Sequence, residues 1–122
     1  MTGANVVDSS GWLEYLGDTA RGPLFAAAIE DSDNLFIPVI SIYEVFKKIL
    51  REQGEDNALQ IASLMLSGTV IDLDSSLALE SAHYRLPLAD SIIYATTIRH
   101  GATLWTQDEH FKHLPHVRYF SL

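Results

Sequence analysis

The sequence predicts an α/β fold in which a parallel sheet of about five strands is covered by helices on both faces. Short, continuously apolar runs alternate along the chain with segments of helical periodicity. Apolar runs of this kind are typical of parallel strands that are buried on both faces. The 122 residues contain no internal repeat or linker, and this length suits one core. We therefore expect a single domain over residues 1–122.

Five segments have the length and composition of buried strands. The first, "NVV", ends directly before Asp8, and the second, "NLFIP", ends directly before a strongly periodic segment. The expected strands cover residues 5–7, 34–38, 69–74, 102–106 and 117–122.

Helical segments lie between these strands. The clearest covers 41–54, where apolar residues recur with the i, i+3, i+4, i+7 spacing of an amphipathic helix that Gly54 closes. Pro23 suits the first turn of another helix, and Pro87 interrupts a third. The expected helices cover residues 10–17, 22–31, 41–54, 56–66, 76–85 and 89–101.

The helix over 89–101 raises a question about one carboxylate. Its sequence, within "LPLADSIIYATT", is apolar almost all round, so the helix is expected to be buried. Asp90 nevertheless lies in its first turn, and a carboxylate rarely enters a core unless its charge is compensated. Stabilisation of the helix dipole is the simplest explanation for this acid, but it does not account for burial.

Three further acids lie where a parallel sheet brings distant segments together. Asp8 follows the first strand, Glu44 lies at the start of the helix after the second, and Asp108 follows the fourth. Ligands of such sheets bind beyond the carboxyl ends of the strands. Each acid alone also has a structural explanation. Asp8 and Asp108 fit helix N-caps, whereas Glu44 fits a capping box over 41–44 or a pair with Lys48.

Taken together, the four acids favour a metal site. Four carboxylates at one edge would repel one another unless they were protonated or bridged by cations. Mg²⁺ is the usual ion for an all-oxygen site, with Mn²⁺ as the alternative. Two such ions, roughly 3.5–4 Å apart, can activate water for phosphodiester cleavage. We interpret Asp8 and Asp90 as the main ligands, with Glu44 and Asp108 completing the catalytic site and orienting the water.

Four motifs resemble, in order and spacing, the acidic motifs of the PIN-domain family, and the VapC-type toxins of toxin–antitoxin pairs in particular. They are "VVDSSGWLEYL", "SIYEVFKKI", "LPLADSIIYATTI" and "LWTQDEHF", and they extend over essentially the whole chain. The resemblance implies a three-layer α/β/α fold and a magnesium-dependent endoribonuclease acting on RNA. Its acids map onto Asp8, Glu44, Asp90 and Asp108, and Thr106 falls where the family often has Ser or Thr. A homodimer and a VapB-like antitoxin, which blocks the acidic pocket with a segment that often carries an arginine, are also implied.

Two other classes of protein remain open. A PIN-like fold that only binds a partner would keep the same acids. A signalling receiver domain also has an acidic pocket at its strand ends, but it needs paired acids after the first strand and a lysine after the last. Here Ser9 and Ser10 follow Asp8, and "VRYFSL" contains no lysine.

The composition limits the partners and the compartment. The formal net charge of −8 disfavours broad electrostatic binding of nucleic acid and suits a basic protein partner. Lys47, Lys48 and Arg51 either contact RNA phosphates locally or form an ordinary solvated face. The absence of cysteine excludes disulfides. No secretory signal or membrane-spanning segment is recognisable, so we expect a cytoplasmic protein.

The segment "HFKHLPH" places His110, His113 and His116 three residues apart. Such spacing on a helix would suggest zinc. Pro115 breaks the helix that would align the three rings, so we expect these histidines on the surface.

Overall fold

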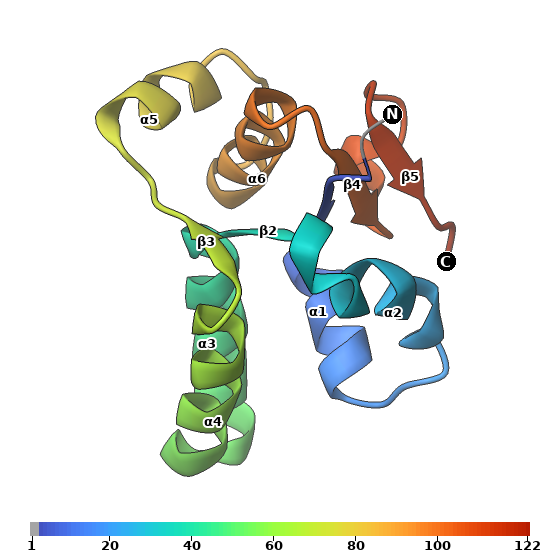
Figure 1. The fold of residues 1–122 in the computed structure, drawn as a ribbon, viewed down its shortest axis with the longest axis vertical. Helices are drawn as coiled ribbons and strands as arrows, with labels where there is room; N and C mark the ends of the chain where they lie inside the picture. Colours follow the sequence, from blue (N-terminus) through green and yellow to red (C-terminus); the bar gives the residue numbers. More distant parts are fainter. Residues whose placement is uncertain (1–2) are drawn as a thin grey trace.

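The computed structural model describes residues 3–122, which form one parallel sheet flanked by helices (Figure 1). Its strands are β1 (Asn5–Val7), β2 (Phe36–Pro38), β3 (Thr69–Ile71), β4 (Thr103–Thr106) and β5 (Val117–Tyr119). Parallel pairing joins β1 to β4, β4 to β5 and β2 to β3. A bridge between Asn5 and Leu35 links the two halves, giving the order β3-β2-β1-β4-β5. The predicted α/β class and parallel sheet are confirmed.

The helices fill the connections between the strands. They are α1 (Ser9–Leu16), α2 (Pro23–Glu30), α3 (Val39–Gln53), α4 (Glu55–Leu66), α5 (Ser75–Ser81) and α6 (Leu88–Arg99), with short 3-10 turns η1 (Ser32–Asn34) and η2 (Glu109–Phe111). Figure 1 shows α3 and α4 packed side by side as a hairpin, and Gly54 joins them with a φ of +91° that favours glycine. No helix among residues 3–122 has the length and apolar content to span a bilayer.

Two apolar cores lie on opposite faces of the sheet, which makes the fold three-layered. Val7 points into the core formed with α1 to α4, whereas Val6 points into the core formed with α6. This alternation follows from the two-residue period of a strand. The register pairs Val6 with Leu104 and Val7 with Trp105, so the side chains of the two neighbouring strands pack into the same two cores.

Helix α6 is buried as predicted. Every residue from Ser91 to Thr97 is buried, including two threonines whose hydroxyls would be costly without partners. Thr96 and Thr97 donate to the carbonyl oxygens of Ile92 and Ile93, at 2.7 and 2.9 Å. Asp90 lies directly before this buried run, at the edge of the core.

Three predicted helix boundaries differ from the structure by two residues or more: the start of α3, the end of α5, and the end of α6, which stops at Arg99 and not near Gly101. Strands β2, β3 and β5 are also two or three residues shorter than predicted. Helix α3 begins at Val39, two residues early, because Pro38 serves as its N-cap, where a missing N–H has no cost. Helix α5 ends at Ser81, four residues early, and Pro87 becomes the N-cap of α6. The residue before a proline is disfavoured in the helical conformation, so the chain leaves α5 before it restarts on Pro87.

Candidate metal centre at the carboxyl edge of the sheet

The central strands bring the first and last of the four acids together. Parallel β1 and β4 end side by side, with Val7 opposite Trp105, so Asp8 emerges next to Thr106. Asp8 is the N-cap of α1, and Asp108 is the N-cap of η2. Both acids therefore have the capping role that the sequence allowed, and both also take part in the cluster described below.

Asp8 is the most buried of the four acids, with 4 % of its surface exposed. Its Oδ2 accepts hydrogen bonds from the hydroxyls of Thr106 at 2.6 Å and Ser10 at 3.2 Å. The Oγ1 of Thr106 also accepts a hydrogen bond from the backbone N–H of Asp108 at 2.9 Å. Thr106, which is fully buried, thus fixes the positions of two acids at once.

Glu44 is held from across the site rather than by its own helix. The hydroxyl of Ser9 donates to its Oε1 at 2.6 Å. The capping-box alternative is wrong, because Ser41 lies inside α3 and its buried hydroxyl has no hydrogen-bond partner. The alternative pair with Lys48 is also not formed, since Lys48 contacts Glu52 at 3.0 Å instead. Sequence reasoning missed Ser9, although the "DSS" that follows the first strand could have indicated it.

Asp90 and Asp108 share one imidazole. The Nδ1 of His110 lies 2.8 Å from Oδ2 of Asp90 and 3.2 Å from Oδ1 of Asp108. Asp108 Oδ1 also accepts the backbone N–H of His110 at 2.9 Å. The prediction for His110 is therefore incomplete: the ring is half-exposed, but its nitrogen is part of the acidic cluster. The short 3-10 turn after Asp108 returns residue 110 to the site, and the helical spacing considered for zinc did not reveal this.

Burial and mutual repulsion oppose ionisation of the cluster. The pKa of Asp8 is raised from 3.8 to about 6, mainly by burial and also by the charges of Asp90 and Asp108, against the lowering effect of the Thr106 hydrogen bond. Burial likewise raises the pKa of Asp90, with added repulsion from Asp108 and Glu44, while His110 opposes this shift. The hydrogen bond to Asp90 raises the pKa of His110.

The donor set fits a divalent cation. Hard carboxylate oxygens predominate, and a bound positive charge would compensate the repulsion that raises the pKa values of Asp8 and Asp90. Among residues 3–122, one group of at least three side chains brings potential ligand atoms within 4.8 Å of one another, and it consists of Asp90, Asp108 and His110. Asp8 and Glu44 are close enough to interact electrostatically with this group: Asp8 with Asp90 and Asp108, and Glu44 with Asp90.

A cationic strip lies beside the acids on α3. Tyr43, Glu44, Lys47, Lys48 and Arg51 line a hollow of about 260 Å³. Tyr43 is 56 % exposed, and the Nζ of Lys47 lies 5.6 Å from the centre of its ring. The strip places positive charge and an aromatic face next to one of the four acids.

Comparisons with known proteins agree with this fold. The family model described as the PIN domain matches residues 6–117, whereas no curated protein sequence matches the chain. A toxin–antitoxin complex from Klebsiella pneumoniae is similar with a TM-score of 0.76 and 21% identity, over 98% of this chain and 100% of that chain. VapC20 from Mycobacterium tuberculosis, a sarcin–ricin loop cleaving toxin, gives 0.74 and 16%, over 98% of both chains. DNA-bound VapBC from Salmonella typhimurium gives 0.73 and 14%, over 99% and 98%. At these identities the structural similarity shows a shared fold alone.

Proposed function

We propose that this chain, which belongs to the PIN-domain family, is a metal-dependent endoribonuclease and the toxin of a VapBC-type toxin–antitoxin pair. The observation that carries the proposal is the convergence of four carboxylates on the carboxyl edge of the sheet, around a buried Asp8. Ordinary structural acids lie apart from one another in water, whereas here the charges of Asp90 and Asp108 raise the pKa of Asp8, and those of Asp108 and Glu44 raise the pKa of Asp90. The structural neighbours, which are toxins or toxin–antitoxin complexes by their names, support the same assignment.

Each acid has a role in this proposal. Asp8 and Asp90 are the main metal ligands, and Glu44 and Asp108 complete the site. The proposed ion is Mg²⁺, with Mn²⁺ as the alternative, because both prefer oxygen ligands. When bound, a divalent ion supplies Lewis-acid chemistry for phosphodiester hydrolysis. Thr106 fixes Asp8 by the hydrogen bond described above, so that its oxygens are preorganised for the ion.

RNA is the proposed substrate, and the cationic strip on α3 is the proposed phosphate contact. Lys47 and Arg51 project from the same helix as Glu44 and share its hollow, so a bound backbone would pass directly by the acids. The strip would also supply the local positive charge that a protein with a formal net charge of −8 needs in order to bind nucleic acid.

A cognate VapB-like antitoxin is the proposed partner. Without metal, the acidic pocket is attractive to a cationic side chain, and arginine fits best because its planar fork bonds two carboxylate oxygens at once. An arginine placed among the four acids would exclude the ion and block cleavage. The complexes named among the structural neighbours contain such partner proteins.

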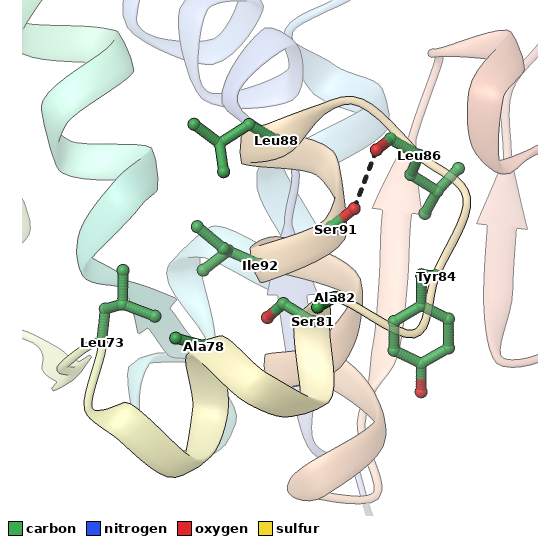
Figure 2. A pocket seen from close by; sticks show the side chains of 9 residues that line it. All are labelled: Leu73, Ala78, Ser81, Ala82, Tyr84, Leu86, Leu88, Ser91 and Ile92. Carbon is green, nitrogen blue, oxygen red and sulfur yellow. Dashed lines mark hydrogen bonds between the residues drawn. The ribbon is translucent and has the colours of Figure 1, made fainter.

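A homodimer is the proposed assembly, and an apolar groove between α5 and α6 is its proposed contact (Figure 2). The groove of about 370 Å³ is lined by side chains that carry no charge. Two copies of a chain with a net charge of −8 can meet there without bringing like charges together. Leu88, which is 79 % exposed, adds apolar surface at the rim of this groove.

The test of the proposed activity is the substitution Asp90→Asn, with Asp56→Asn as the matched control. Both acids lie in the first turn of a helix, but Asp56 is exposed on α4. With Mg²⁺ and a structured RNA, Asp90→Asn should lower the cleavage rate by about a hundredfold or more, because a ligand is lost. Asp56→Asn should cleave like the wild type. Wild-type activity in Asp90→Asn would refute the assignment, and a wild type that binds a partner without cleaving RNA would favour the binding-only alternative.

A further inference from the structure

We propose that His110 is a ligand of the metal ion held by the four acids, and that its nitrogen biases the site toward first-row transition ions over Mg²⁺. This inference rests on the proposed function, because it concerns the same centre. It adds a nitrogen ligand to the four acids that the motifs supply. The consequence is a centre with oxygen and nitrogen ligands instead of one built from oxygen alone.

The first support is the position of the ring. Nδ1 of His110 points between two carboxylates, 2.8 Å from Asp90 Oδ2 and 3.2 Å from Asp108 Oδ1. Adjacent ligands on an octahedral ion with bonds of ~2.1 Å lie about 3.0 Å apart. The two distances from Nδ1 are therefore close to the spacing of neighbouring ligands, and the ligand atoms of all three side chains lie within 4.8 Å of one another. A small shift that opens space for an ion would keep all three on its coordination sphere.

The second support is the backbone that holds the ring there. Asp108 caps η2 and accepts the N–H of His110 at 2.9 Å, so residues 108 and 110 belong to one short hydrogen-bonded turn. Phe111, the next residue, is fully buried in the core around α6 and anchors that turn. The imidazole is thus held at the site by elements that also fix a proposed ligand, as a metal ligand requires.

The chemistry of the donor decides the metal preference. Mg²⁺ prefers oxygen ligands and holds several waters, whereas an imidazole nitrogen suits later first-row ions. Affinity for such ions rises from Mn²⁺ to Co²⁺ at sites with nitrogen ligands. The contribution of His110 should therefore be largest for Co²⁺, smaller for Mn²⁺ and smallest for Mg²⁺.

The opposite role for His110 makes a contrary prediction. If its ring only bonds the carboxylates while metal is absent, it competes with the ion for the same oxygens. Removing the ring would then strengthen the binding of every ion. The direction of change in metal affinity therefore separates a ligand from a competitor.

The experiment compares His110→Ala with the wild type, with His113→Ala as the control. His113 is exposed on the same segment and lies outside the group of possible ligands. Calorimetric titration of the full chain with Co²⁺, Mn²⁺ and Mg²⁺ should show His110→Ala weakening Co²⁺ binding by about tenfold or more, and Mg²⁺ binding by much less. Pulsed electron paramagnetic resonance of bound Mn²⁺ should show nitrogen coupling in the wild type and in His113→Ala, but not in His110→Ala.

Different outcomes would overturn the inference and the proposed function. Suppose that Asp90→Asn abolishes metal binding, but the wild type shows no nitrogen coupling or His110→Ala binds the ions more tightly. This result would overturn the role of His110 and leave the nuclease centre intact. Binding that Asp90→Asn does not change, for all three ions, would refute the four-acid centre itself.

Discussion

The buried charge of Asp8 predicts a pH-dependent cost to the metal-free protein. Its pKa rises from 3.8 to about 6 on folding, mainly through burial. A shift of about 2 pKa units corresponds to roughly 3 kcal/mol between the two protonation states. Below about pH 3 the carboxyl is largely protonated in both the folded and the unfolded chain, and the cost is small. As the pH rises from about 4 to 6, the folded state holds more protons than the unfolded state, so stability falls. Above pH 6 the full cost is present.

The substitution Asp8→Asn removes this charge and should remove its pH dependence. In EDTA, the free energy of unfolding of the wild type should fall by roughly 2 to 3 kcal/mol between pH 4 and pH 8 through Asp8 alone. The free energy of unfolding of Asp8→Asn, relative to that of the wild type, should therefore rise by the same amount over that pH range. An amide has a single oxygen, so it cannot accept both the hydroxyl bonds that reach Oδ2 and the Ser10 N–H bond that reaches Oδ1. Comparing the two pH values cancels this fixed cost.

Urea denaturation of both proteins, followed by circular dichroism at several pH values, measures this quantity directly. Titrations of Asp90 and His110 occur in both proteins and drop out of the comparison to first order. Saturating Mg²⁺ should abolish the advantage of the variant at pH 8, because the ion compensates the charge. A stability difference that does not change with pH, or an advantage that survives in Mg²⁺, would show that Asp8 is not a strained carboxylate at the metal centre.

Four further predictions rest on the same geometry. Millimolar Mg²⁺ or Mn²⁺ should raise the melting temperature of the wild type in differential scanning calorimetry. At an ion concentration of a hundred times the dissociation constant, the stabilisation should be about 2.7 kcal/mol, and the Asp8→Asn/Asp90→Asn variant should lose most of it. Thr106→Val removes a hydrogen bond that lowers the pKa of Asp8, so the pH at which cleavage is half-maximal should move upward in a pH–rate profile; an unchanged profile would contradict this role. Leu88→Glu should convert a dimer to a monomer in light scattering, while Leu122→Glu, equally exposed but outside the groove, should not. Inhibition by the co-purified antitoxin should weaken as Mg²⁺ rises, because ion and arginine compete for the four acids; inhibition that ignores Mg²⁺ would refute the arginine mechanism.

The fold was predictable because its signals are local and repeated. Apolar strands of three to four residues, separated by helical segments, leave a parallel sheet as the simple way to bury both faces. The strand order then removes the receiver alternative, since β3-β2-β1-β4-β5 differs from the 2-1-3-4-5 order of that fold, and the PIN family model matches the chain. Helix ends were less predictable. Pro38 and Pro87 act as N-caps, and sequence periodicity does not show where the preceding segment stops.

The acids of the site were predictable from topology, but their supporting contacts were not. A residue one or two positions after a parallel strand must lie at the carboxyl edge of the sheet, and this rule alone places Asp8 and Asp108 at the same edge. Glu44 and Asp90 reach that edge only through the packing of α3 and α6. The contacts of Ser9 with Glu44 and of His110 with Asp90 join residues 35 and 20 positions apart, across elements whose separation no sequence pattern fixes. A 3-10 turn of three residues decides whether His110 faces solvent or the acids. The proposed metal preference of the centre therefore depends on a turn that periodicity cannot detect, while the positions of Asp8 and Asp108 follow from the strands that precede them.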